Sequence, residues 1–206
     1  MALLRERDWE TWGLDASVAL ARYCRQRFAG QGGTALVCAV AEALPFRRAS
    51  FDRLVCQGSL DHFARPQAFL REVARVLKPA GLAVIAISNY DSLSCRVGRA
   101  LFQLKERFAI PVYQGRLYWQ VPANHTFRGT YDTLRQLSEP YLELVECRGV
   151  SLFWLFHRWT RLMETLPRPL AWSTMAALDR IAYRMPAIAD LLVSVWRPRR
   201  TADAQA

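Results

Sequence analysis

The chain lacks the features that mark a secreted or membrane-spanning protein. Its first residues become charged by Arg5, so they do not form the apolar stretch of a secretory signal. No apolar run reaches the ~18 residues that a spanning helix needs. We therefore expect a cytoplasmic protein. Its 206 residues, 52% hydrophobic and 22% charged, predict one globular domain.

Cysteine pairs and metal-binding motifs are absent as well. The chain has five cysteines, an odd number, with no C-x-x-C pair and no histidine at ligand spacing. They are Cys24, Cys38, Cys56, Cys95 and Cys147. This pattern predicts neither a disulfide framework nor a metal site, and it indicates buried, reduced thiols.

Acidic residues are few relative to basic ones. The 18 Asp and Glu stand against 28 Lys and Arg, which gives a net charge of +10. Such an excess is compatible with nucleic acid, an anionic membrane surface or an anionic substrate, and charge alone does not choose among them. One tight basic cluster, residues 197–200, precedes a polar tail that ends at residue 206. We expect a solvated end there, with lipid headgroups or nucleic acid as alternatives.

Short apolar runs alternate with helix-like spacing in the first part of the chain. The predicted strands are residues 9–14, 34–39, 51–57 and 82–87, and the predicted helices are 16–28 and 66–77. This alternation predicts an α/β fold with a doubly wound, mostly parallel sheet, in which the last of these strands is covered on both faces. Ligands of such sheets bind at the carboxyl ends of the strands, here Asp15, Val40 and Gln57.

Four segments of this region resemble a known family in order and spacing. They are Gly13–Ser17, Ala39–Phe46, Ser50–Asp52 and Leu70–Leu82. Together they are similar to the class I S-adenosylmethionine-dependent methyltransferases, and among these to small-molecule enzymes such as the quinone-biosynthesis C-methyltransferases. The resemblance implies a Rossmann-like fold, S-adenosyl-L-methionine as cofactor, and a partial cofactor-binding core at residues 1–87.

The resemblance also implies which residues hold the cofactor. Asp15, with Ala16 beside it, would accept hydrogen bonds from the ribose hydroxyls, although Asp15 is equally suited to cap the helix that follows. Ala41 would meet the adenine through its backbone N–H, and Val40 stands where the family usually has an acid. Gln57 would lie near the methionine end.

Two histidines are candidates for the substrate side. His62 follows the strand at 51–57, and His125 precedes a predicted helix at 131–137. A histidine there can act as a general base or as a hydrogen-bond partner near neutral pH. The alternatives are a capping or packing histidine for His62 and a surface-loop histidine for His125. No metal is expected.

The family's opening strand and its glycine-rich G-x-G-x-G loop have no counterpart in the chain. Residues 2–7 resemble the last turns of the helix that follows that loop. We therefore expect an N-terminally truncated methyltransferase domain. The alternative function is a catalytically inactive relic or an interaction protein. Nucleic acid is not favoured as a partner, because no N/D-P-P-Y/F sequence follows residue 56.

The second half of the chain is expected to cover the acceptor. Residues 88–140 correspond to the family's substrate-covering region, and residues 141–147 and 189–196 predict an antiparallel edge hairpin. Between these strands lies a helical insertion at 151–188. Its first part, 151–163, combines tryptophans and apolar residues with His157, Arg158 and Arg161. It predicts peripheral membrane contact or a lid over a lipid-like substrate, the alternatives being packing on the sheet edge or a dimer contact.

Overall fold

The computed structural model describes residues 9–27, 34–111, 115, 117–154, 156 and 159–199. The predictions at residues 2–7, at His157 and Arg158, and in the tail from residue 200 lie outside this part. The strands are β1 (Thr11–Asp15), β2 (Thr34–Cys38), β3 (Phe51–Gln57), β4 (Leu77–Ser88), β5 (Leu142–Val150) and β6 (Leu191–Pro198). The helices are α2 (Val18–Arg27), α3 (Pro66–Val76), α4 (Leu93–Arg107), α5 (Tyr131–Ser138), α6 (Trp159–Thr165) and α7 (Arg168–Arg184), with short 3₁₀ turns η1 (Leu60–His62) and η2 (Pro186–Ile188).

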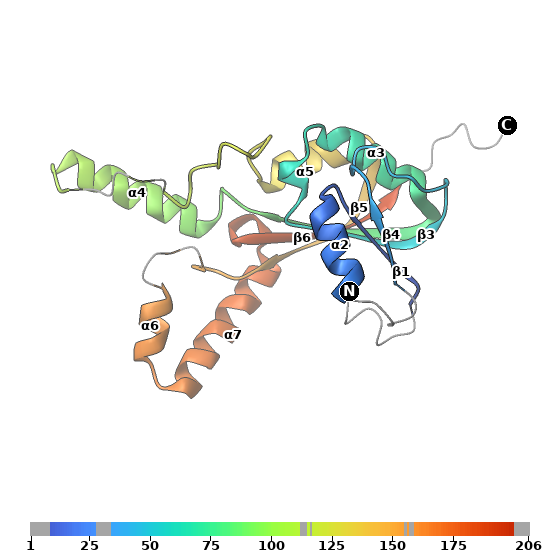
Figure 1. The fold of residues 1–206 in the computed structure, drawn as a ribbon. Helices are drawn as coiled ribbons and strands as arrows, with labels where there is room; N and C mark the ends of the chain where they lie inside the picture. Colours follow the sequence, from blue (N-terminus) through green and yellow to red (C-terminus); the bar gives the residue numbers. More distant parts are fainter. Residues whose placement is uncertain are drawn as a thin grey trace.

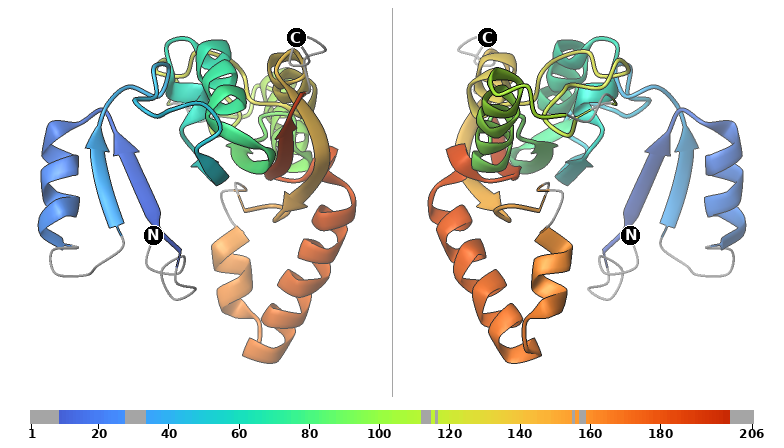
Figure 2. Two further views of the ribbon diagram at one scale, coloured as in Figure 1. Left: turned by 90° about the vertical axis from the view of Figure 1, so that its right-hand side faces the viewer. Right: turned by 90° about the vertical axis from the view of Figure 1, so that its left-hand side faces the viewer.

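The strands form two separate sheets rather than one. β1 and β2 pair in parallel, from Thr11 opposite Thr34 to Asp15 opposite Cys38. The other four strands follow the order β3-β4-β6-β5, in which β3 and β4 are parallel and the pairs β4–β6 and β6–β5 are antiparallel. The views in Figure 2 show the β1–β2 pair and α2 standing apart from the larger sheet.

The α/β prediction is therefore confirmed, whereas the mostly parallel single sheet is wrong. The larger sheet is mixed because β6 enters it antiparallel, between β4 and β5. Among the described residues, neither β1 nor β2 pairs with a strand of the larger sheet. The antiparallel pairing of the last two strands agrees with the predicted hairpin, and its outer strand, β5, forms the edge.

The hydrophobic core lies between the larger sheet and the helices α3 and α5 (Figure 1). Pro66 opens α3 at its first turn, where its missing N–H costs nothing, and the helix presents one apolar stripe to the sheet. The buried members of this stripe are Phe69, Leu70, Val73 and Val76. The first three share the main core cluster with alternate residues of β4, Ala83, Ile85 and Ile87.

The opposite face of β4 is only half-buried, at Leu82, Val84 and Ala86. The prediction that this strand is covered on both faces is therefore wrong. The strand is also longer than predicted, because its pairing with β3 begins at Leu77, directly after α3.

The predicted covering region contains a helix that the sequence analysis did not anticipate. α4 begins after Ser92, whose Oγ accepts a hydrogen bond from the backbone N–H of Cys95 at 3.3 Å. Ser94 and Cys95 are buried in its first turn, and the helix then extends away from the sheet (Figure 1). The predicted helix at 131–137 corresponds to α5, which Thr130 caps through its Oγ1.

The predicted helical insertion corresponds to α6 and α7, which lie between β5 and β6. Figure 2 shows the two helices as a hairpin that projects from the sheet. Its base is fixed where Ala182 of α7 packs against Leu152 and Ala189. Within the described part of the chain, no helix has the length and apolar character needed to cross a bilayer.

Candidate functional site

The carboxyl ends of β1 and β2 lie together at one end of the small sheet. Asp15 is opposite Cys38, and the N–H of Ala39 donates to the carbonyl of Asp15 at 3.2 Å. The thiol of Cys38 lies 3.6 Å from the carbonyl of Ala16. This contact joins the end of β2 to the loop that follows β1. Leu14 packs against the main core cluster. The strand-end residues predicted for cofactor binding on β1 and β2 are therefore neighbours.

Asp15 holds the turn that leads into α2 and keeps one oxygen available. Its Oδ1 accepts a hydrogen bond from the N–H of Ser17 at 2.7 Å, and Ser17 is the residue that caps α2, since its Oγ accepts a hydrogen bond from the N–H of Leu20 at 3.3 Å. The cap is therefore Ser17 and not Asp15. For Oδ2 of the half-buried carboxylate, the described residues provide no hydrogen bond, so this oxygen can still accept from a ligand hydroxyl.

Val40 and Ala41 form the turn after β2. The side chain of Val40 is 52% exposed, whereas Ala41 is 8% exposed and belongs to the main core cluster. A hydrogen bond from Ala43 N–H to the carbonyl of Val40 closes the turn at 3.2 Å. An exposed isopropyl group beside a buried alanine provides an apolar surface on which a flat ring can pack.

The chain turns sharply at the end of β3. Gln57 is exposed, and Gly58 has a φ of +60°, the left-handed region that glycine enters at no steric cost. No atom lies within 4 Å of the place where a Cβ would stand on Gly58. The N–H of Gly58 donates to the carbonyl of Ala86 at 2.9 Å, which holds this turn against β4. The turn leads directly into η1.

Asp61 of η1 fixes the segment that carries His125. The backbone carbonyl of Asp61 accepts hydrogen bonds from the N–H of Thr126 at 2.8 Å and from its Oγ1 at 3.2 Å. The side chains of Asp61 and His125 are only 4% and 9% exposed, and Asp61 Oδ2 lies 3.0 Å from His125 Nδ1. Two segments that are distant in the sequence therefore meet at a buried carboxylate and imidazole.

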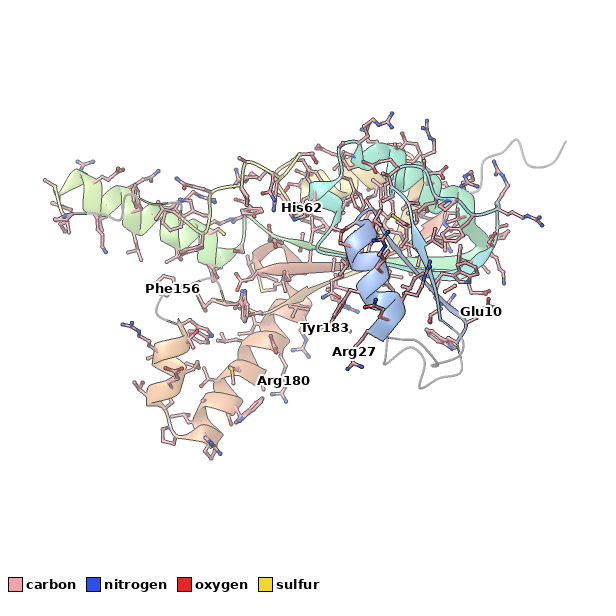
Figure 3. The ribbon with its side chains drawn as sticks, viewed as in Figure 1. Glu10, Arg27, His62, Phe156, Arg180 and Tyr183 are labelled. Atoms are coloured by element: carbon pink, nitrogen blue, oxygen red, sulfur yellow. The ribbon has the colours of Figure 1, made fainter. Side chains whose placement is uncertain are left out.

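His62 completes this cluster from the solvent side (Figure 3). Its side chain is 43% exposed, its ring centroid lies 4.5 Å from that of His125, and the two rings are almost perpendicular. Its Nδ1 lies 3.3 Å from the side-chain amide of Asn124. Tyr90 packs its ring edge-on at 5.8 Å from His125. The two predicted histidines are thus brought together.

Asp61, Asn124 and Tyr90 were not singled out from the sequence. One signal for Asp61 was present, because it directly precedes His62 in the segment that follows a strand. His125 is not the surface-loop histidine of the alternative interpretation, since its side chain is buried.

The cysteines provide no second reactive group beside this cluster. Burial raises the pKa of Cys56 to about 12, and the negative charge of Asp61 acts in the same direction. Burial also raises the pKa of Cys95, and that of Cys147 to about 11. These thiols stay protonated at neutral pH and are poor nucleophiles. All five cysteines are free, and Cys38 is exposed, which corrects the prediction that all are buried.

The comparisons with known proteins point to one family. The sequence pattern described as a methyltransferase domain matches residues 1–85. A curated relative, the ubiquinone biosynthesis O-methyltransferase of Parvibaculum lavamentivorans, is 30% identical over 132 residues. Residues 1–85 therefore match a methyltransferase domain, and the chain is similar to the class I S-adenosylmethionine-dependent methyltransferases. The alignment with this relative covers 62% of the chain and 47% of the relative, so the chain spans about half of that protein.

Solved structures show the same fold. The PH0226 protein of Pyrococcus horikoshii superposes with a TM-score of 0.59 at 17% identity, over 96% of this chain and 76% of that protein. An S-adenosylmethionine-dependent methyltransferase of Thermotoga maritima gives a TM-score of 0.54 at 17% identity, over 91% and 72%. The methyltransferase fold therefore extends beyond the region that the family pattern matches.

Proposed function

We propose that this methyltransferase domain transfers the methyl group of S-adenosylmethionine to a small-molecule or lipid-like acceptor. The observation that carries the proposal is Asp15, a carboxylate at the carboxyl end of β1 with one oxygen left to accept hydrogen bonds. Strand ends of this kind bind the ribose of nucleotide cofactors. The cofactor supplies the reactive carbon, and the protein aligns donor and acceptor.

The residues present fit the nucleoside half of the cofactor. Asp15 Oδ2 would accept from the ribose, with Ala16 beside it, and the exposed face of Val40 would pack on the adenine while the N–H of Ala41 meets the ring edge. Because Val40 replaces an acid, one polar contact is missing, which costs roughly 1–3 kcal/mol of affinity if the adenine amine stays unpaired. Gln57 and the open turn at Gly58 would adjoin the methionine end.

The acceptor would lie on the side of His62. His62 is exposed enough to meet a substrate, and the buried Asp61 and His125 hold the segments around it in place. An imidazole at this position can remove a proton from an acceptor hydroxyl as the methyl group is transferred. The relative from P. lavamentivorans is named for ubiquinone biosynthesis, which supports an isoprenoid quinone among the lipid-like acceptors.

Asp15→Asn tests the proposal by calorimetric titration with S-adenosylmethionine. The amide oxygen of asparagine can accept the same hydrogen bond from Ser17 N–H, and Ser17 still caps α2, so the helix should persist, but the charge that strengthens the ribose hydrogen bonds is lost. A loss of about 1.5–3 kcal/mol corresponds to roughly 10- to 100-fold weaker binding. Asp52→Asn, which alters an exposed carboxylate on β3 paired with Lys78, is the matched control and should bind as the parent does. Equal affinity of Asp15→Asn and the parent would contradict the assignment of Asp15.

The second candidate function is an inactive relic or an interaction protein. It is favoured by the separation of the β1–β2 pair from the larger sheet and by the replacement of an acid by Val40. The same titration distinguishes the two candidates. No detectable binding of S-adenosylmethionine by the folded parent chain would favour the relic, whereas saturable binding would favour the enzyme.

We also propose that the same enzyme contacts a membrane surface through the α6–α7 hairpin and the segment that precedes it. Large apolar side chains are exposed on it and on the segment that precedes it, with Trp154 68% and Trp172 69% exposed. Further exposed members are Leu162, Leu170, Ile181, Tyr183 and Met185. Arginines 161, 168, 180 and 184 lie on the same two helices, and Figure 3 labels Arg180 and Tyr183 on α7. Tryptophans interleaved with cations are typical of segments that lie in a membrane interface.

Co-sedimentation with vesicles of anionic phospholipid tests this contact. The parent chain should bind, and replacing both Trp154 and Trp172 with serine should weaken binding at least about tenfold, because burying one large apolar side chain contributes about 1.5–3 kcal/mol. Trp9→Ser is the matched control, since Trp9 is 45% exposed but lies before β1. Equal binding by the parent and the double variant would contradict the contact.

A further inference from the structure

Three side chains converge on one point beside β3. Each of Asp61, His62 and His125 offers a nitrogen or oxygen atom, and these atoms all lie within 4.8 Å of one another. Asp61 and His62 come from η1, and His125 comes from the segment between α4 and α5. The hydrogen bonds from Thr126 to the carbonyl of Asp61 hold the two segments in this arrangement.

Hydrogen bonding within the protein does not account for the two buried members. His125 Nδ1 and Asp61 Oδ2 are 3.0 Å apart, but they are not aligned as a hydrogen bond. Among the described residues, His125 Nδ1 and Asp61 Oδ1 have no hydrogen-bond partner, although both side chains are more than nine-tenths buried. Buried polar atoms of this kind are rarely left without a partner. Among the described residues, both atoms are therefore able to bond to a further species.

We propose that Asp61, His62 and His125 bind a divalent transition-metal ion such as Zn²⁺. Two imidazoles and one carboxylate are a donor set that Zn²⁺ accepts, at about 2.0–2.2 Å from each atom. Bonds of that length in a tetrahedron separate neighbouring ligand atoms by about 3.3 Å. His125 Nδ1 lies 3.0 Å from Asp61 Oδ2, and His62 Nε2 lies 4.0 Å from Asp61 Oδ1, so the two imidazoles approach different oxygens of one carboxylate. With the ligand atoms up to 4.8 Å apart, the exposed side chain of His62 would move inward to complete the site.

The surroundings of the cluster also suit a metal ion. Asn124 lies 3.3 Å from His62 Nδ1, and with the amide oxygen turned toward the ring it would accept the Nδ1–H and leave Nε2 as the ligand atom. The exposed side chain of His62 provides a route of entry from solvent. Three protein ligands leave a fourth position open, the arrangement of zinc sites that also bind water or a substrate. A metal-bound His62 has no free nitrogen to act as a base, so with the metal in place the loss of a proton from an acceptor hydroxyl would be favoured by the metal ion at this fourth position instead.

The test measures Zn²⁺ binding by the chelator-treated chain in competition with a chromophoric chelator, without S-adenosylmethionine. We expect one Zn²⁺ per chain and, with Co²⁺ as a spectroscopic substitute, a visible absorption band. His62→Ala removes the exposed ligand and should weaken binding at least about tenfold, the lower bound for losing even a supporting group. Asp61→Asn should do the same, and Asp52→Asn is the control that keeps the parent's affinity.

Thermal melting supplies a readout of folding. Zn²⁺ should raise the melting temperature of the parent and of Asp52→Asn, and should not raise that of His62→Ala. The proposal is overturned if the parent binds no Zn²⁺, or if the parent, His62→Ala and Asp61→Asn bind it equally, in which case the cluster is a buried His–Asp contact only. Since cofactor binding is measured separately, failure of this proposal leaves the proposed methyl transfer standing.

Discussion

Trp196→Ala is expected to lower the free energy of unfolding by about 3–5 kcal/mol. Trp196 lies on β6 in the middle of the larger sheet and is fully buried. Its Nε1–H donates to Ser194 Oγ at 2.7 Å, and Ser194 in turn donates to the carbonyl of Ile85 at 2.9 Å. The substitution therefore leaves a cavity and removes the hydrogen bond that Ser194 Oγ accepts, whereas the bond from Ser194 to Ile85 on β4 remains. Chemical denaturation followed by circular dichroism measures the loss.

Trp172→Ala is the matched control for this prediction. Trp172 lies on α7 with 69% of its surface exposed, so its removal should change the free energy of unfolding by no more than about 0.5 kcal/mol. Equal losses in the two variants would show that Trp196 does not lie in the core of the larger sheet.

Asp190→Ala is expected to cost about 3 kcal/mol and to lower the melting temperature by roughly 6–12 °C. The fully buried carboxylate of Asp190 accepts from Ser94 Oγ at 2.6 Å and from the N–H of Trp154 at 2.7 Å. It thereby joins β6 to α4 and holds a segment in which Ser151 and Phe153 have positive φ angles. Calorimetry measures the shift, and Asp52→Ala, at an exposed ion pair, should change little.

Asp190→Asn separates the charge of this side chain from its shape. Burial raises the pKa of Asp190 above its ordinary value of 3.8, against the opposing effect of its hydrogen bonds. The folded state therefore favours the protonated acid. The stability this provides is complete below the ordinary pKa and is lost as the pH rises through the raised one. The stability of Asp190→Asn relative to the parent should rise between pH 4 and pH 7, and a constant difference would contradict the pKa direction.

Local patterns in the sequence were sufficient to predict most of the elements. The proline at position 66 and the apolar stripe that follows it locate α3, and the bounds of β3 agree with the prediction at both ends. Such signals are local, because one proline or one periodic run decides the backbone conformation. α4 was missed because residues 88–140 were assigned to a substrate-covering region on the resemblance alone, and the cap of α4 at Ser92 depends on one side-chain hydrogen bond.

Strand order and the composition of the site depend on contacts between distant residues. The position of β6 between β4 and β5 cannot be derived from the sequence, because an apolar run such as that of β6 could pair with any strand of the sheet. Similarly, His62 and His125 were each found from their local sequence, but their contact results from the hydrogen bonds between Thr126 and Asp61. Asp61 was missed because it belongs to the site only through its contact with His125, which is remote in the sequence.

The lack of strand pairing between the two sheets has a consequence for nucleotide binding. Asp15 belongs to the small unit of β1, α2 and β2, and the turn at Gln57 and Gly58 belongs to the larger sheet. A two-stranded pair is only marginally stable by itself in water. A ligand that contacts both Asp15 and the turn at Gln57 and Gly58 would connect the two units. Part of its binding free energy would be used to fix their relative orientation. Cofactor affinity and the rigidity of the N-terminal unit would then depend on each other.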